Sequence, residues 1–226
     1  MRFRFLPRLA GLLLLAALAP LRAAATIHYT ISLANRAENR FGVRMEIPDA
    51  NQATELDMPV WNGLYQVREF ASRILELHAS TAAGTAISLR RLTPHSWLAG
   101  PAGGRLIVEY SIEWDEPGPF SSQLNDSHAF LNAATLLLFV PQRRSEDVTL
   151  ELRDVPQAWR VATALDSGSA ANSYLARSYD DLVQAPIEAG TFTDFSLQVA
   201  GREIRVVVHA APPAPESPSC PKDTDR

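Results

Sequence analysis

The sequence is poor in the residues that cross-link small exported proteins or hold catalytic metals. Its 226 residues include one cysteine, Cys220, so no internal disulfide can form and stability depends on packing. None of the five histidines begins an H-E-x-x-H motif, in which one helix presents two imidazoles to zinc and a glutamate to water. We therefore predict no catalytic residue, no metal ligand and no cofactor in this chain.

A strongly basic surface is missing as well. The formal net charge is -4, and the first 25 residues contain four arginines and no acid, so the remainder of the chain carries -8. Nucleic acids and anionic membranes attract basic patches. An acidic body without basic runs therefore predicts no nucleic-acid partner and no attraction to an anionic membrane surface.

No apolar run is long enough to span a membrane. The stretch 9–21 is apolar throughout, but it is shorter than the ~20 residues that a span needs. It follows a short basic start and precedes Ala23 and Ala25, small residues at the third-last and last positions before a cleavage site. These features predict that residues 1–25 are a signal peptide and that the chain is periplasmic or secreted, without a stable membrane anchor.

After residue 26, apolar and polar residues alternate in many short runs. Such alternation predicts strands with one buried and one wet face. The runs occur at 29–33, 43–47, 106–114, 148–152, 195–199 and 204–208, and 159–165 adds a further strand. A tight turn at Ala200-Gly201 predicts a hairpin between the last two runs. We therefore predict an all-β fold over 26–209, an antiparallel β-sandwich of many short strands with at most short helical turns.

Four segments depart from the alternation. By propensity, 67–78 could form a helix, and 178–184 could form one turn that starts from a Ser178 cap. The stretch 130–140 is almost continuously apolar, which predicts a central strand buried on both faces. Residues 210–226 hold five prolines and no aromatic residue, which predicts a Pro-rich disordered tail.

Four motifs give the chain a family resemblance. They are MPVWNGLYQVREF at 58–70, DSHAFLN at 126–132, WRVATAL at 159–165 and YDDLVQAPIEAG at 179–190. Their order and spacing resemble the N-terminal β-domain of the glycyl-aminopeptidase family of gluzincin metallopeptidases. The turn within 58–70 is one residue shorter than the family pattern and lacks its proline. In that family the β-sandwich precedes a thermolysin-like zinc domain, and the H-E-x-x-H motif of that domain does not occur here.

The segment 61–69 holds the densest group of aromatic and charged side chains, with Trp61, Tyr65, Arg68 and Glu69. These residues could line a surface that faces a catalytic domain or a peptide. Alternatively, the aromatics fill the sandwich while Arg68 and Glu69 pair locally. Buried aromatic residues usually serve packing, which favours the second interpretation.

The motif Asp126-Ser127-His128 contains the three residue types of a hydrolase triad. A triad is defined in space, however, and neighbouring residues on an extended chain point to opposite faces. We therefore favour a structural role for Asp126, His128 and Asn132, in which His128 satisfies the backbone of a turn.

Together these observations predict a non-catalytic exported accessory domain that resembles the N-terminal domain of a zinc aminopeptidase. It would bind protein, or be part of a truncated or split peptidase, with a separate zinc-peptidase domain or a second copy as partner. The alternative is a free-standing periplasmic module that binds peptides or carbohydrates through 61–70. A docking domain should expose a contiguous apolar patch, which we expect from 61–70 and 120–130.

The signal peptide gives the first testable prediction. The mature N-terminus should be Thr26, within a residue or two, because the small residues Ala23 and Ala25 precede it. N-terminal sequencing of protein taken from the periplasm measures this directly. Recovery of the uncleaved chain from the cytosol or the membrane would contradict it.

Overall fold

The computed structural model describes residues 26–60 and 67–209. The predicted signal peptide, the predicted tail and the residues 61–66, with Trp61 and Tyr65, lie outside this part. Within it, strands dominate and the helices are one or two turns long, which confirms the all-β fold class. No described helix has the length and hydrophobicity that crossing a bilayer requires.

The largest sheet has seven strands in the order β12-β13-β10-β1-β2-β7-β4. Its strands are β1 (Ile27–Asn35), β2 (Arg40–Ala50), β4 (Ile74–Thr81), β7 (Gly104–Glu113), β10 (Val148–Arg153), β12 (Asp166–Ser167) and β13 (Ser173–Ala176). The pairing is antiparallel except between β1 and β10, which run parallel. The single parallel pair joins the N-terminal half of the sheet to the C-terminal half.

Three smaller sheets accompany it, in the orders β11-β14-β9-β8, β3-β6-β5 and β15-β16. The four-stranded sheet contains β8 (Gln123–Leu124), β9 (His128–Leu131), β11 (Arg160–Thr163) and β14 (Ile187–Gly190). The others contain β3 (Thr54–Asp57), β5 (Leu89–Thr93), β6 (Ser96–Ala99), β15 (Thr193–Val199) and β16 (Arg202–Val208). The helical elements are η1 (Arg36–Glu38), η2 (Phe70–Arg73), α1 (Ala133–Leu136), η3 (Pro141–Arg143) and α2 (Tyr179–Gln184).

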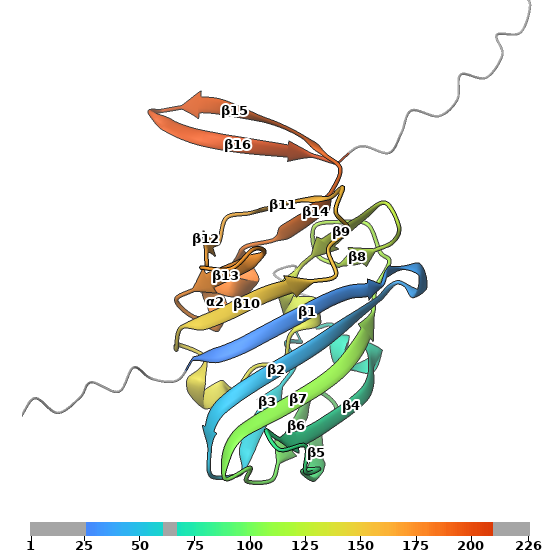
Figure 1. Cartoon of the computed structure of the whole chain (residues 1–226), viewed down its shortest axis with the longest axis vertical. Helices are drawn as coiled ribbons and strands as arrows, with labels where there is room; N and C mark the ends of the chain where they lie inside the picture. Colours follow the sequence, from blue (N-terminus) through green and yellow to red (C-terminus); the bar gives the residue numbers. More distant parts are fainter. Residues whose placement is uncertain (1–25, 61–66, 210–226) are drawn as a thin grey trace, which may run out of the picture.

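The core lies against one face of the large sheet. The alternating apolar residues of β1, β2, β7 and β10 are almost all buried and belong to one hydrophobic cluster, as the period-two pattern predicted. Residues of β3, β6, β9, α1 and α2 pack on that cluster from the other side. Figure 1 shows the β15-β16 hairpin projecting beyond this body, next to the four-stranded sheet.

The helix predicted over 67–78 is wrong. The segment contains only the short turn η2, and from Ile74 onward it is the edge strand β4, which pairs with β7. A register shift between Leu75 and His78, with Glu76 at a φ of 55°, marks an irregularity of the bulge type in this strand. Helix propensity is a weak local preference, and pairing with a buried strand overrides it.

The central strand predicted over 130–140 is only partly right. Strand β9 ends at Leu131, and the Asn132 side chain then accepts a hydrogen bond from the amide of Ala134 at 3.2 Å and caps α1. The following residues Leu136 to Leu138 are fully buried but belong to no sheet. The continuous hydrophobicity correctly indicated burial and did not indicate a strand.

Aromatic side chains replace sheet pairing along this buried segment. Three buried tyrosine hydroxyls donate to three consecutive carbonyls: Tyr29 to Leu138 at 2.9 Å, Tyr179 to Leu137 at 2.7 Å and Tyr110 to Leu136 at 2.7 Å. The indole of Trp114 donates to the Thr135 carbonyl at 3.2 Å. Burial raises the pKa of Tyr29, Tyr110 and Tyr179 well above that of a free phenol, so all three remain protonated donors.

The predictions at 178–184 and 195–208 are confirmed in secondary structure. The Ser178 hydroxyl accepts from the Asp181 amide at 3.0 Å and starts α2. The β15-β16 turn has φ of 50° at Ala200 and 77° at Gly201, as a two-residue turn with positive φ at both positions requires. The alternation also predicted that one face of this hairpin is buried. That prediction is wrong, because every residue of β15 is exposed.

The tyrosine contacts give a prediction for stability. Replacing Tyr110 by Phe removes the donor to the Leu136 carbonyl and the acceptor of the Leu138 amide, which lies at 3.0 Å. Two buried backbone groups lose their partner, so the free energy of unfolding should fall by about 1–3 kcal/mol. Denaturant unfolding measures it.

The matched control is Tyr174→Phe, because Tyr174 is also largely buried and its hydroxyl makes no hydrogen bond within the described residues. We expect this variant to change the free energy of unfolding by no more than about 0.5 kcal/mol. Equal losses for the two variants would show that the Tyr110 hydrogen bonds add nothing beyond packing.

Candidate functional site

Of the candidate residues in the segment 61–69, Arg68 and Glu69 are described, and both are exposed. The Arg68 amide donates to the Val60 carbonyl at 2.7 Å, and the Glu69 carbonyl accepts from Ser72. Both residues line a hollow that Trp114 also lines. The described contacts of these two residues are therefore backbone contacts of a turn.

The residues Asp126, Ser127 and His128 do not form a triad. The carboxylate of Asp126 is exposed and pairs with Arg36 at 3.3 Å. The hydroxyl of Ser127 donates to the Asn125 side chain at 2.6 Å, and His128 turns inward to other partners. The three side chains point to three separate places, as expected for neighbours on an extended chain.

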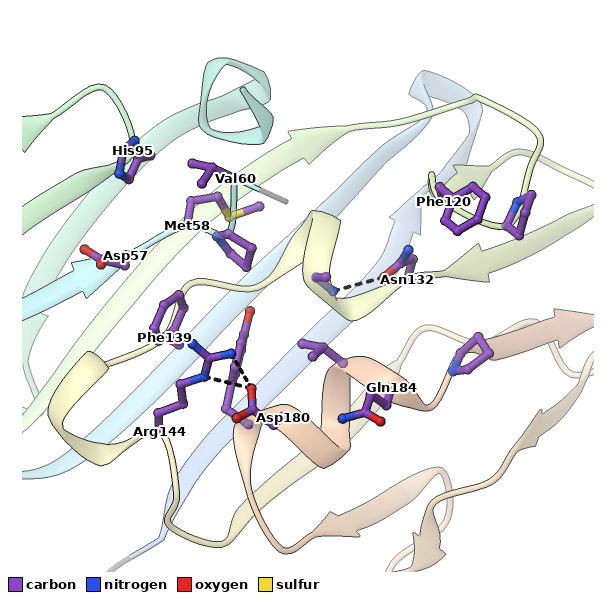
Figure 2. Close-up of a pocket in the computed structure, with 16 residues that line it drawn as sticks. Asp57, Met58, Val60, His95, Phe120, Asn132, Phe139, Arg144, Asp180 and Gln184 are labelled. Carbon is purple, nitrogen blue, oxygen red and sulfur yellow. Dashed lines mark hydrogen bonds and ion pairs between the residues drawn. The ribbon is translucent and has the colours of Figure 1, made fainter. Parts of the chain in front are cut away.

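Asn132 has the structural role described above, as the cap of α1. Its carbonyl also accepts from the Thr135 hydroxyl at 2.9 Å, and its amide donates to the Ser122 hydroxyl at 3.0 Å. The side chain nevertheless lines a groove on the described surface. Figure 2 shows it there, joined to the first turn of the helix.

That groove has a volume of about 650 Å³ and runs between β3 and α2. Its walls combine apolar side chains with several polar ones, and the lining includes Asp57, Met58, Val60, His95, Phe120, Asn132, Phe139, Arg144, Asp180 and Gln184. Figure 2 shows Arg144 and Asp180 joined across one side, with Phe139 beside the guanidinium. A groove of this size and mixed chemistry is suitable for a peptide or a small polar ligand.

Asp57 is the unsatisfied polar group of this groove. Its backbone bridges to Phe139, while its Oδ1 atom is buried and has no hydrogen-bond partner within the described residues. Burial raises the pKa of the Asp57 carboxyl, and the negative charge of Glu55 raises it further, against an opposing effect of His95. A partly buried carboxylate without a partner is a potential contact for a cationic group.

A second group of polar side chains converges at the base of the hairpin. His128 of β9 and Glu188 of β14 lie 2.9 Å apart between Nδ1 and Oε1, and His209 follows β16 with its Nδ1 at 3.7 Å from the same oxygen. The two imidazole rings stack with centroids 3.9 Å apart. Opposite His128, a side chain on Gly190 would come within 2.9 Å of the His128 Cβ, so glycine leaves room for the ring.

Sequence reasoning selected His128 but missed Glu188 and His209 as its partners. His128 and Glu188 lie on two strands and His209 follows a third, with long stretches of chain between them, so no local spacing connects them. A search for H-E-x-x-H finds only metal ligands that lie on one helix. The sequence-based expectation of no metal ligand therefore did not consider this cluster.

The β15-β16 hairpin carries the densest exposed apolar surface of the described residues. Phe195 faces Val206 and Leu197 faces Ile204 across the ribbon, with Val199 and Val208 on the same face. Phe195, Leu197, Val199, Ile204 and Val208 are 41–51% exposed. The opposite face is polar, and its Asp194 pairs with Arg160 of β11 and with Arg205.

The expected apolar patch is therefore found on a segment that sequence reasoning did not select. Residues 61–66 of the selected segments lie outside the described part of the chain. Among the residues that are described, Phe120 is 39% and Val67 80% exposed, and neither belongs to a row of exposed apolar neighbours like that of the hairpin. A two-stranded ribbon has no second layer, so its alternating pattern leaves a whole apolar face in water.

Asp57 gives a prediction about pH. Its raised pKa means that the folded state disfavours the carboxylate, so the Asp57 contribution to stability is present in acid and is lost as pH rises through the folded pKa. Asp57→Asn should therefore unfold at a higher denaturant concentration than wild type at pH 7. The advantage should shrink below about pH 4, where the carboxyl is protonated in both states.

Asp147→Asn provides the control, because Asp147 is exposed. It should leave the midpoint of denaturation nearly unchanged at both pH values. An Asp57→Asn variant that is less stable than wild type at pH 7 would show that the carboxylate has a stabilising partner.

Among solved structures, an aminopeptidase N family protein from Idiomarina loihiensis superimposes with a TM-score of 0.77 at 24% sequence identity. The match covers 82% of this chain and 33% of that one. An M1 zinc metallopeptidase mutant from Deinococcus radiodurans gives a TM-score of 0.40 at 11% identity, over 86% of this chain and 49% of that one. No curated protein matches.

The first of these matches shows a shared fold, and this chain spans about a third of the length of that neighbour. The family description "Peptidase M61 N-terminal domain" matches residues 28–191, from the start of β1 to the end of β14. The match includes the three sheets that contribute to the core and stops just before the hairpin. The chain belongs to the family of peptidase M61 N-terminal domains.

Proposed function

We propose that this chain is an exported, non-catalytic domain that docks on a metallopeptidase catalytic domain through the apolar face of the β15-β16 hairpin. The observation that carries the proposal is the amphipathic hairpin, with a row of half-exposed apolar side chains on one face. An isolated two-stranded hairpin is at best marginally stable in water, and an exposed apolar row usually marks an interface.

The family supports a peptidase domain as the occupant of that face. Domains of this family are defined as the N-terminal part of a peptidase, and the neighbour from Idiomarina loihiensis contains the shared fold within a chain of which it forms only a third. The hairpin begins two residues after the matched domain ends, so it follows that domain on its C-terminal side.

The proposed lack of catalysis is supported by the ligands that the family's zinc requires. Peptidases of the gluzincin type hold zinc with H-E-x-x-H, and the sequence does not contain it. In the cluster of His128, Glu188 and His209, the first two residues lie on strands and His209 follows one, so the cluster lacks the helix-borne glutamate of that motif. Catalysis would thus come from the partner.

Docking is tested with the zinc domain of an M61 peptidase, expressed without its own N-terminal domain. The wild-type chain should form a one-to-one complex in sedimentation velocity. Leu197→Asp places a charge in the middle of the apolar row and should weaken binding by about tenfold or more. Ser196→Asp, on the polar face next to it, should bind like wild type.

Three results would contradict the proposal. The first is a chain that stays monomeric with the zinc domain. The second is a homodimer that Leu197→Asp dissolves, because the face would then bind a second copy. The third is equal affinity for Leu197→Asp and Ser196→Asp.

A second candidate function is that of a peptide-binding module, and the groove of Figure 2 favours it. Its buried Asp57 oxygen without a partner would accept a hydrogen bond from a peptide amine or a basic side chain. A bound basic peptide that protects the groove from hydrogen exchange, and that Asp57→Asn no longer binds, would support this function.

A further inference from the structure

The cluster at the base of the hairpin consists of three side chains that are all potential metal ligands. One ligand atom from each of His128, Glu188 and His209 lies within 4.8 Å of the other two. The side chains are only 11%, 15% and 20% exposed, respectively. Groups of this kind are costly to bury unless they are paired, so their meeting in one place calls for a compensating charge.

The contacts of His128 place one ring nitrogen against Gln123 and the other against Glu188. The amide nitrogen of Gln123 donates to Asp115 at 2.9 Å, which turns its oxygen toward the Nε2 atom of His128 at 3.0 Å. Nε2 must therefore carry the hydrogen. In a neutral imidazole the Nδ1 atom then has a lone pair, and here that lone pair faces the Glu188 oxygen at 2.9 Å.

Either a proton on Nδ1 or a metal cation can bridge these two atoms. His209 repeats the situation, because its Nδ1 is buried, faces the same oxygen at 3.7 Å and has no hydrogen-bond partner within the described residues. The Nδ1 atoms of both imidazoles thus lie near the same Glu188 oxygen. A single proton would satisfy one histidine and leave the other without a partner.

We propose that His128, Glu188 and His209 bind a divalent transition-metal cation of the zinc class. Two imidazole nitrogens and one carboxylate oxygen are a common ligand set for zinc. Tetrahedral bonds of about 2.0–2.2 Å separate neighbouring ligand atoms by about 3.3 Å. The separations of 2.9 and 3.7 Å from the Glu188 oxygen lie on either side of this value. Because the two rings stack nearly parallel, at an interplanar angle of 4°, one imidazole must turn out of the stack to direct its lone pair at the same ion.

The surroundings fit a cation with a fourth position open to water. Glu188 and His209 border a hollow of about 490 Å³ that also contacts Phe130 and Arg205. Arg205 also lines this hollow, but its positive charge is paired with Asp194, at 2.7 Å. Gln123 holds His128 in the tautomer that leaves Nδ1 available, which is the usual role of a residue that supports a metal ligand.

The position of the site indicates what the metal would do. His128 and Glu188 belong to the four-stranded sheet, whereas His209 is the residue at which the hairpin ends. A metal bound by all three would fix the base of the hairpin to the sheet and so set the direction of its apolar face. This inference does not depend on the proposed docking partner, because it concerns this chain alone.

The test uses tag-free protein, stripped of metal, with Zn²⁺ and Co²⁺ as the probes. Calorimetric titration should show one Zn²⁺ per chain, and Co²⁺ should give the visible absorption of a tetrahedral site. His209→Ala and Glu188→Gln should each lower the affinity by at least about tenfold. The exposed His78 provides the control, and His78→Ala should bind like wild type.

Hydrogen exchange distinguishes a bound site from a misfolded variant. Zn²⁺ should slow exchange of the β15 and β16 amides in wild type and His78→Ala but not in His209→Ala, whose core should exchange normally because His209 lies beyond the last strand. The absence of one-to-one binding, or equal affinity in His209→Ala and wild type, would overturn the proposal. So would hairpin exchange that responds to pH alone, since the cluster would then bind only protons.

Discussion

The fold depends on how one buried segment without strand pairing satisfies its backbone. Leu136, Leu137 and Leu138 are fully buried, and their three carbonyls accept hydrogen bonds from the hydroxyls of three tyrosines. A buried carbonyl without a donor is expensive, so the segment can occupy the core only where these donors reach it. The tyrosines come from β1, β7 and α2, and the contacts therefore join the large sheet to the layer that covers it.

This arrangement also positions both candidate sites. The segment connects α1, which begins at the cap Asn132, to Phe139, whose backbone bridges to Asp57 in the groove. Before the cap, β9 begins with His128, the centre of the second cluster. A change in the buried segment would therefore affect the groove and the base of the hairpin together.

The hairpin and the histidine cluster are two parts of one region. The apolar face offers binding energy, but a two-stranded ribbon is easily displaced. Asp194 with Arg160 connects its polar face to the sheet, and His209 connects its end to Glu188 and His128. An exposed ion pair contributes little to stability, so the buried cluster is the stronger candidate for holding the hairpin in place.

The sequence by itself determined the strands with clear alternation, the Ser178 cap and the turn at Ala200-Gly201, because alternation, capping and turn geometry depend on neighbouring residues. The motifs at 58–70, 126–132, 159–165 and 179–190 also indicated the family. Only the tertiary structure decided which alternating faces are covered, since β1 and β15 share one pattern and only β1 has a second layer. It also decided the path of Leu136–Leu138 and the meeting of His128, Glu188 and His209, because both depend on contacts between residues far apart in the chain.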